Sequence, residues 1–363
     1  QTYRDAAHQA FHGVSVGSGT RLWRSSFDAA VFTATHPAAA LEFSTTGVHV
    51  FADLTLHGGS TSTPVDLRSA ASGTPFRLNV ARSTATAARF IDADATAGPV
   101  LFANDGRSLD AGRNAGVEFR PFVLVLSPGE TFTPSTGRAG TPSLQTAGVP
   151  FVVTVLAVSD RFLPVTASSI SVAAGSADPY DTEPAAAALT GGSRTFTLSL
   201  RRAEPAPLAV VLTASGVGSS GISASTTSVQ PGPFSALQPL LPGESASPGT
   251  ALGRGGVSEF QIKARAFSVG VRAVDSFGNL ITALTHNVAV ASVSGASATL
   301  PASAALSAGS VTLTGLLVHA TGVQTLTLTD LSSATLPAAV SSTFSVFSLS
   351  AGSPTVNFAF PSG

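Results

Sequence analysis

Short runs in which apolar and polar residues alternate constrain this chain more than any other feature. Residues 195–200 read Thr-Phe-Thr-Leu-Ser-Leu, and residues 324–329 read Gln-Thr-Leu-Thr-Leu-Thr. Successive side chains of a β-strand point to opposite faces, so a period of two predicts strands with one buried face. Clusters such as Asn104-Asp105-Gly106 and Pro231-Gly232-Pro233 predict the turns between strands. We therefore expect an all-β chain built from sandwiches rather than βαβ units.

The composition excludes several classes of protein. Of the 363 residues only 11% are charged, 44% are hydrophobic and the net charge is −1. Disorder needs low hydrophobicity and high net charge, and nucleic-acid binding needs an excess of basic side chains, so neither is expected. The chain has no cysteine, which excludes disulfides and Cys-ligated metals. The longest apolar stretch, residues 149–158, is too short to span a bilayer.

The same composition favours association of the chain with itself. The mean hydropathy is +0.34. A net charge near zero gives little mutual repulsion, and large exposed apolar patches on soluble proteins mark interfaces. The expected partner is therefore a second copy of the chain, in a homopolymer.

Two landmarks recur at nearly one spacing. Residues 155–160 match residues 271–276 at an offset of 116, and residues 189–198 match residues 306–315 at an offset of 117. Such self-similarity predicts a duplicated module. Weaker echoes lie upstream, where residues 45–51 resemble residues 190–196 and residues 72–80 resemble residues 147–155. The expected organisation is a diverged β-module or assembly region (1–66), a β-rich module (67–143), an immunoglobulin-like sandwich (144–228), a Pro/Gly/Ser-rich linker or inserted loop (229–256), a second sandwich (257–350) and a terminal strand tail (351–363).

The second of these modules resembles a known family. It opens with Ala273-Val-Asp275-Ser-Phe-Gly278-Asn279 and closes with Gly322-Val-Gln-Thr-Leu-Thr-Leu-Thr-Asp330. These motifs resemble the bacterial immunoglobulin-like repeats of large secreted surface proteins, which are similar to invasin and filamin domains. The resemblance implies tandem immunoglobulin-like β-sandwiches that act as spacers, adhesins or filament subunits. In the turn itself, we expect Asp275 to accept backbone hydrogen bonds and Gly278-Asn279 to tolerate positive φ.

Two glycine-containing motifs are more typical of loops than of catalysis. Gly13-Val-Ser15-Val-Gly17 matches the nucleophile elbow Gly-x-Ser-x-Gly, which needs a strand before it and a helix after it. Gly216-Val-Gly218-Ser-Ser-Gly221 matches the dinucleotide motif Gly-x-Gly-x-x-Gly, which needs a following helix to hold the pyrophosphate. Neither is followed by a helical pattern, so we expect no enzymatic activity and no cofactor.

Metal sites have weak support. His8 and His12 have the spacing of one helical face but no third ligand nearby, and the chain has no regular twelve-residue calcium loop. Asp178, Asp181 and Glu183 cluster in one loop and are weak calcium candidates. Solvated turns are the expected alternative for these carboxylates.

We therefore expect a secreted, extracellular structural protein at the cell surface, a subunit of a self-assembling filament, sheath or layer. The first alternative is a surface adhesin that binds a glycan or host protein through its loops, and the second is a viral capsid or fibre protein. An alternating strand at the end of a chain can complete the sheet of a neighbouring chain. The alternative is that such a strand pairs within its own module. The expected assembly contacts are apolar residues of two such segments: Phe11, Val14, Val16, Val356, Phe358 and Phe360.

Overall fold

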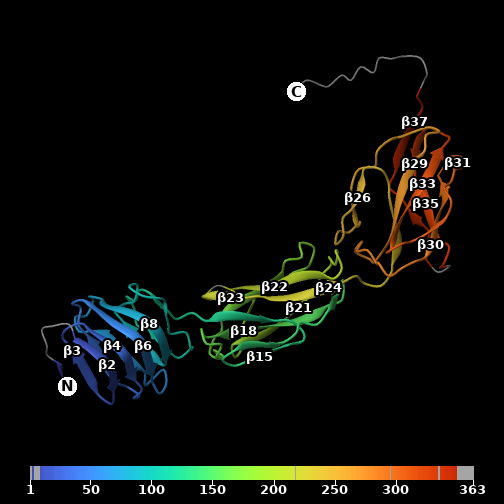
Figure 1. Cartoon of the computed structure of the whole chain (residues 1–363). Helices are drawn as coiled ribbons and strands as arrows, with labels where there is room; N and C mark the ends of the chain where they lie inside the picture. The colour runs from blue at the N-terminus through green and yellow to red at the C-terminus, as the bar shows by residue number, and fades with distance from the viewer. Residues whose placement is uncertain (1, 4–8, 217, 295, 334–335, 350–363) are drawn as a thin grey trace, which may run out of the picture.

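The computed structural model describes residues 2–3, 9–216, 218–294, 296–333 and 336–349. All helical or strand elements in these residues are strands, which confirms the all-β class. Buried apolar side chains form three large cores that follow one another along the chain. Figure 1 shows the corresponding bodies in a row, with the first and last described residues at opposite ends.

The first body is a parallel β-solenoid of two sheets, between which the chain alternates. The six-stranded sheet has the order β1-β3-β5-β7-β9-β12, the five-stranded sheet has the order β10-β8-β6-β4-β2, and every pairing is parallel. The strands are β1 (Thr2–Tyr3), β2 (Gln9–Val16), β3 (Thr20–Trp23), β4 (Phe27–Ala34), β5 (Ala40–Phe43), β6 (Val48–His57), β7 (Val65–Ser69), β8 (Phe76–Thr86), β9 (Ala88–Ile91), β10 (Ala93–Asp94) and β12 (Leu109–Asp110). A short parallel pair, β11 (Leu101–Phe102) and β13 (Val117–Glu118), follows.

The solenoid is held together by columns of like side chains. Leu41, Leu67 and Phe90 are paired in register across three coils and are fully buried. The ring of Phe43 stacks on the rings of Trp23 and Phe76 at centroid distances of 5.1 and 4.9 Å. Because strands alternate their faces, the apolar residue of each pair points inward, and each coil buries the apolar layer of the next.

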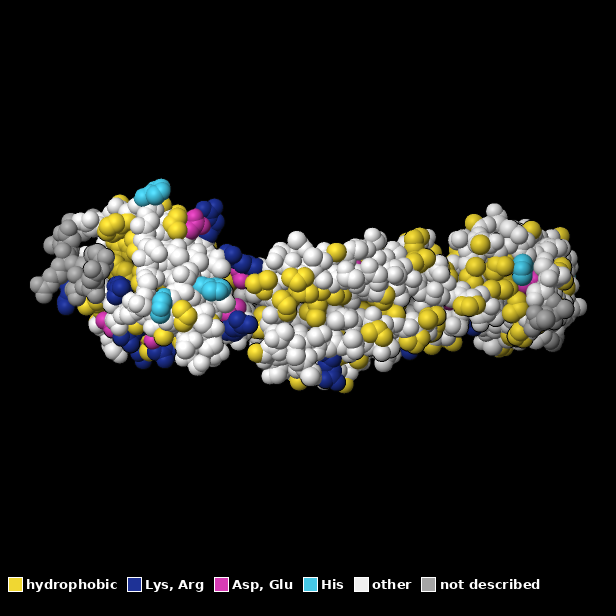
Figure 2. Space-filling view, turned by 90° about the horizontal axis from the view of Figure 1, so that it is seen from below, with side chains coloured by type: hydrophobic (Ala, Val, Ile, Leu, Met, Phe, Trp, Pro, Cys, Tyr) yellow, Lys and Arg dark blue, Asp and Glu magenta, His cyan; other side chains and the backbone are white. Residues whose placement is uncertain are grey.

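Charged side chains pair across the outside of the same stack. Asp66 of β7 receives two hydrogen bonds of 2.5 Å from Arg89 of β9, its register partner. Glu42–Arg68 and Asp53–Arg82 bridge other coils in the same way. Figure 2 shows most of the charged side chains of that face over the solenoid and its junction with the next body.

This architecture corrects the expected division of the N-terminal region. A boundary between residues 66 and 67 would fall inside β7, and both sheets continue through it. The supposed sandwich echoes at residues 45–51 and 72–80 belong to β6 and β8, which are neighbouring parallel strands of one sheet. The diverged N-terminal β-region is therefore a single solenoid that extends to about residue 119.

The second body is a mainly antiparallel sandwich of the immunoglobulin-like kind, with parallel pairs only at β14-β23 and β17-β24 among its described strands. Its sheets have the orders β21-β18-β14-β23 and β17-β24-β22-β19-β20, and a hairpin β15-β16 projects from the first strand. The strands are β14 (Phe122–Leu126), β15 (Glu130–Thr133), β16 (Gly137–Gly140), β17 (Gln145–Thr146), β18 (Phe151–Val158), β19 (Ser171–Ser176), β20 (Ala187–Ala188), β21 (Ser193–Leu198), β22 (Leu208–Gly216), β23 (Gly221–Ser223) and β24 (Ser225–Gln230).

The third body repeats this plan. Its sheets have the orders β25-β29-β33-β31, β32-β30-β35-β36 and β28-β37-β34, with the hairpin β26-β27. The strands are β25 (Ala236–Leu240), β26 (Glu244–Ala246), β27 (Arg254–Gly256), β28 (Gln261–Ile262), β29 (Phe267–Val274), β30 (Asn287–Val293), β31 (Ala298–Thr299), β32 (Ala304–Ala305), β33 (Ser310–Val318), β34 (Gly322–Gln324), β35 (Leu326–Asp330), β36 (Ala339–Val340) and β37 (Phe344–Phe347).

The duplication read from the sequence is confirmed, but it is longer than expected. Strands β18 and β29 occupy the same place in the two sandwiches, and each pairs with an equivalent partner, β21 or β33. The supposed linker, residues 229–256, holds β25 and the hairpin β26-β27 of the second sandwich. Two of its glycines, Gly243 and Gly256, have positive φ at the base of the hairpin, a conformation that glycine adopts readily. Residues 120–143 form the equivalent first strand and hairpin of the first sandwich rather than part of a separate module.

In the part of the chain that the structure describes, no helix is long and apolar enough to cross a membrane.

Candidate assembly site and inter-module joints

Among the described residues, the five-stranded sheet of the solenoid has an open edge at its N-terminal end. Strand β2 pairs with β4 on one side, and among the described residues no strand pairs with its other side. An unpaired edge offers a row of backbone N–H and C=O groups to another strand, and soluble proteins commonly block such edges with charged side chains. Strand β2 reads Gln-Ala-Phe-His-Gly-Val-Ser-Val, without lysine, arginine or an acidic residue. It is therefore an edge that can accept a strand.

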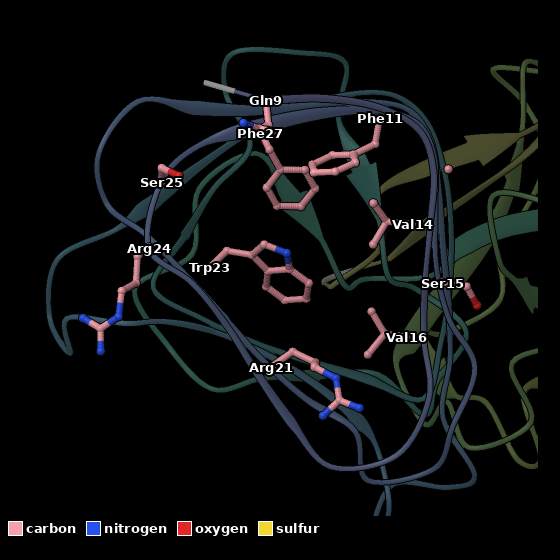
Figure 3. Close-up of a pocket in the computed structure, with 11 residues that line it drawn as sticks. Gln9, Phe11, Val14, Ser15, Val16, Arg21, Trp23, Arg24, Ser25 and Phe27 are labelled. Carbon is pink, nitrogen blue, oxygen red and sulfur yellow. The ribbon is translucent and has the colours of Figure 1, made fainter. Parts of the chain in front are cut away.

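Beside this edge the apolar interior of the solenoid is exposed in a pocket of about 430 Å³. Figure 3 shows Phe11, Val14 and Val16 of β2 pointing toward Trp23 and Phe27, while Ser15 points away. Phe11 is 40% exposed and contacts the Phe27 ring edge-on at 5.8 Å, whereas Val16 is 5% exposed. The pocket is lined by Gln9, Phe11, Gly13, Val14, Ser15, Val16, Arg21, Trp23, Arg24, Ser25 and Phe27.

Residues 4–8, which connect β1 to β2, lie outside the described residues. Their sequence is Arg-Asp-Ala-Ala-His, which contains no large apolar side chain.

The other end of the solenoid is closed by the first sandwich. Asn104, which is 1% exposed, accepts a hydrogen bond of 3.1 Å from the Asp160 N–H, and Arg161 donates one of 2.8 Å to the Ser83 carbonyl. The rings of Phe102 and Phe122 lie 5.4 Å apart. Burial in this joint raises the pKa of Asp160, and the neighbouring Arg161 opposes that shift. The first joint is thus a contact of buried polar and aromatic groups.

The second joint is built around Asn279, whose side chain is fully buried between the two sandwiches. Its Oδ1 accepts a hydrogen bond from the Ala203 N–H, and its Nδ2 donates to the Arg201 carbonyl, both at 2.8 Å. Glu204 of the first sandwich receives hydrogen bonds from Arg272 and from the Leu280 N–H. A buried polar group without a partner costs on the order of 1–3 kcal/mol, so this set of bonds favours one arrangement of the two sandwiches.

The Asp-x-x-Gly-Asn motif therefore has two roles. As expected, Asp275 accepts turn hydrogen bonds, from Phe277 and Asn279, and Gly278 has φ of 74°. The role of Asn279 differs from the expectation, because it bonds to the preceding sandwich instead of adopting positive φ. The equivalent loop of the first sandwich, residues 159–163, contacts the solenoid. Both joints thus use the loop that follows the equivalent strand of each sandwich, β18 in the first and β29 in the second.

The far end of the second sandwich differs from the surface of the first sandwich that receives the loop containing Phe277. Gly148 lies under the Phe277 ring, and a Cβ at position 148 would come within 2.3 Å of a ring carbon. The equivalent residue is Ala264, since both residues have positive φ and donate to equivalent carbonyls, Leu200 and Val318. The Ala264 methyl group therefore takes up the space that an equivalent aromatic ring would need at this end. The same joint therefore cannot form again at the far end without displacement.

The structure does not gather the weak calcium candidates into a metal site. Asp178 is 4% exposed, and its carboxylate accepts hydrogen bonds from the backbone of Tyr180, Arg201 and Arg202. Asp181 accepts from the Ser176 hydroxyl, and burial raises its pKa with help from nearby acidic charges. Within the described ranges no three His, Asp or Glu side chains are grouped to hold a metal ion. Asp178 instead fixes the loop that leads to the second joint.

Neither glycine motif has the surroundings that its chemistry requires. Ser15 lies in edge strand β2, which is followed by the turn at Gly19 and by strand β3. Gly216 ends β22, and the short strand β23 begins at Gly221. Strands follow both motifs where a catalytic elbow or a nucleotide site needs a helix.

Of the six expected assembly residues, the structure brings together Phe11, Val14 and Val16. The other three, Val356, Phe358 and Phe360, lie outside the described residues. The sequence analysis missed Trp23 and Phe27 of the same pocket, as well as Asn104 and Asn279 of the joints. The signal for the pocket was the recurrence of Trp or Phe near the ends of strands β3, β5 and β9.

A comparison with protein-family models finds no match, and a comparison with curated proteins finds no relative. Several solved structures are similar at low level. The D00-D0 domain of intimin is 10% identical, with 62% of this chain and 99% of that chain covered and a TM-score of 0.30. Invasin, described as a bacterial integrin-binding protein, is 13% identical over 60% of this chain and 38% of its own, with a TM-score of 0.24. A β-glycosidase from Bacteroides vulgatus is 11% identical over 62% of this chain and 25% of its own, with a TM-score of 0.23. The chain thus spans a quarter of that glycosidase and about two fifths of invasin, and TM-scores this low do not establish a common fold.

Proposed function

We propose that this chain is an extracellular structural protein of the cell surface, a subunit of a self-assembling filament, sheath or layer. The observation that carries the proposal lies at the N-terminal end of the solenoid, where an edge strand without charged side chains lies beside a largely apolar pocket. Edges and core ends of this kind are sites of association between chains.

The two joints support a structural role for the rest of the chain. Both bury hydrogen-bonded polar side chains between neighbouring modules, which restricts bending between them. A row of modules with restricted joints acts as a spacer that holds its end at a distance. We infer that the sandwiches serve as a semi-rigid rod and that the solenoid end serves as the contact between subunits.

Electron microscopy and light scattering over a range of concentrations test the proposal. The wild-type chain should form regular polymers, and Val14→Asp should abolish them because it places a charge among the apolar side chains of the pocket. Ala52→Asp is the matched control, since Ala52 is an exposed residue of strand β6 in the same sheet that does not line the pocket, and it should leave polymers intact. Far-ultraviolet circular dichroism checks that both variants fold.

Elongated monomers of the wild-type chain at all concentrations would overturn the proposal. If such monomers bound glycans in an array, the adhesin alternative would replace it, and closed shells in the micrographs would support the capsid alternative.

A further inference from the structure

The open end requires an occupant with definite properties. It must pair with β2 as a strand, because the exposed groups are those of a strand edge. It must carry large apolar side chains on alternate residues, because only one face of a strand points into the pocket. The face that enters the pocket should lack charge, because it meets the apolar lining residues Val14, Val16, Trp23 and Phe27. It should above all carry no cationic side chain, because Arg21 and Arg24 also line the pocket.

One segment of this chain has these properties and is not already part of a described sheet. Residues 355–360 read Thr-Val-Asn-Phe-Ala-Phe, so that Val356, Phe358 and Phe360 share one face. Residues 350–363 contain no charged residue. We propose that this segment adds to β2 as a strand and places Phe358 and Phe360 against Trp23 and Phe27, a deepening of the function proposed above, on which it rests.

The segment that occupies the pocket belongs to a second copy. Phe360 lies eleven residues beyond Leu349, and at most about 3.5 Å per residue that span reaches about 40 Å. Figure 1 shows the sandwiches in a row between β37 and the solenoid, with β18 and β29 running along that row. These eight-residue strands alone span roughly 26 Å each, and the stack of five strands adds roughly 20 Å. The segment therefore falls short of the open end of its own chain.

This contact fixes the symmetry of the polymer. The segment at one end of a subunit enters the pocket at the other end of the next, so the two surfaces are different. Repetition of such a head-to-tail contact produces an open polar filament rather than a closed dimer. At the far end of the second sandwich, Ala264 stands at the position equivalent to Gly148. A second copy therefore cannot stack there through the type of joint that links the two sandwiches.

Trp23 is the single tryptophan of the chain and lines the pocket, so its fluorescence reports the contact directly. The experiment uses the chain without residues 350–363, which leaves all three cores intact, and a synthetic peptide of residues 353–361. The peptide should bind with a blue shift of the Trp23 emission. Binding should be at least tenfold weaker to the same chain with Val14→Asp and unchanged with Ala52→Asp, since Ala52 is exposed on β6 and does not line the pocket. In the peptide, Phe358→Asp should abolish binding, and the outward-facing Asn357→Asp should leave it within about twofold.

In parallel, polymer formation is compared between the full chain and the chain without residues 350–363. Loss of polymers in the shortened chain, together with peptide binding, supports the inference. Polymers that persist in the shortened chain would overturn it and leave the proposed function standing. If the full chain forms no polymers, the proposed function fails, and the peptide titration alone then decides whether the pocket captures this strand. A peptide that does not alter the emission and does not bind in equilibrium dialysis would refute the inference whatever the polymers show.

Discussion

The solenoid and the sandwiches bury their apolar side chains in different ways. In the solenoid every coil covers the coil beneath it, and the strands of the larger sheet pair in one parallel series from β1 to β12. In each sandwich, sheets of mainly antiparallel strands face one another and enclose a core on their inner faces. A stack is therefore unfinished at its ends, whereas a sandwich is closed by its own sheets.

This difference explains where the candidate assembly site lies. One end of the stack is covered by the first sandwich through Asn104 and Phe102, and at the other end the buried side chains of Trp23 and Phe27 line a pocket. The sandwiches use their ends for joints instead. In the proposed filament, the solenoid would therefore supply the contact between subunits and the sandwiches would supply the length.

The largest expected effect separates the two regions as folding units. Leu67 of the solenoid and Leu212 of the first sandwich are both fully buried, and replacing either by alanine should cost about 2–5 kcal/mol. Urea unfolding followed by Trp23 fluorescence reports the solenoid, since Trp23 is the only tryptophan. Leu67→Ala should lower the midpoint of that transition, and Leu212→Ala should leave it in place. Equal shifts from both variants would show that the regions unfold as one unit.

The second effect compares the two joints. Asn279→Ala should remove the side-chain bonds to Ala203 and Arg201 and free the sandwiches to bend, at a cost of about 1–3 kcal/mol for the groups left unpaired. Asn104→Ala should loosen the solenoid joint less, because that side chain receives one backbone bond from the adjacent module. Spin-label distance distributions across each joint measure this. Asn279→Ala should broaden only the distribution across the second joint, and Asn104→Ala serves as its control.

The sequence predicts the sandwiches better than the solenoid, and the reason is physical. Sandwich strands recur at a fixed spacing because the whole module was duplicated, so β18 and β29 could be matched from residues 155–160 and 271–276. The solenoid has no fixed period. Successive strands of one sheet pair at offsets of 18, 22 and 29 residues, as in Ala10–Asp28, Asp28–Val50 and Val48–Arg77. Coils tolerate loops of different length outside the stack, which hides the repeat in the sequence.

The candidate site was predictable only in part. The alternation around Phe11, Val14 and Val16 identifies an apolar strand face, but not that β2 has an open edge, which depends on the strand order of the whole sheet. The sequence predicts Asn279 to be a turn residue and gives no sign of its role in the joint. The reason is that its hydrogen-bond partners, Ala203 and Arg201, lie more than seventy residues earlier. The hairpin was missed although Pro128-Gly129-Glu130 and Pro242-Gly243-Glu244 repeat, with each Glu bonded to the backbone three residues earlier. A search for repeats limited to alternating segments does not detect such a turn.

The third effect is an opposite response of the two regions to acid. Hydrogen bonds from Arg113 and from the Gly73 N–H hold the pKa of Asp92 in the solenoid below its usual value of 3.8, whereas burial raises the pKa of Asp160 above it. The stabilisation from Asp92 is present above the unfolded pKa and is lost as the pH falls through it toward the folded value. The carboxylate of Asp160 destabilises the first joint at neutral pH, and protonation as the pH falls through its raised pKa removes that cost. Between pH 6 and 3 the solenoid transition should therefore lose stability, and Asp92→Asn should flatten this loss, while Asp160→Asn should stabilise the joint at neutral pH.

The smallest expected effect concerns the charges that run along the outside of the stack. Arg89 pairs with Asp66 across two coils, but its side chain is 43% exposed, and exposed ion pairs contribute at most about 1 kcal/mol. Arg89→Gln should therefore lower the Trp23 unfolding midpoint by less than a quarter of the shift caused by Leu67→Ala. Because salt screens exposed charges, the difference between Arg89→Gln and the wild type should shrink further between 0.05 and about 1 M sodium chloride. A loss as large as that of Leu67→Ala would mean that the ion-pair ladder, and not the apolar columns, holds the coils together. The open end would then be better matched by a charged partner than by the uncharged strand proposed here, since the coils below it would owe their stacking to charge.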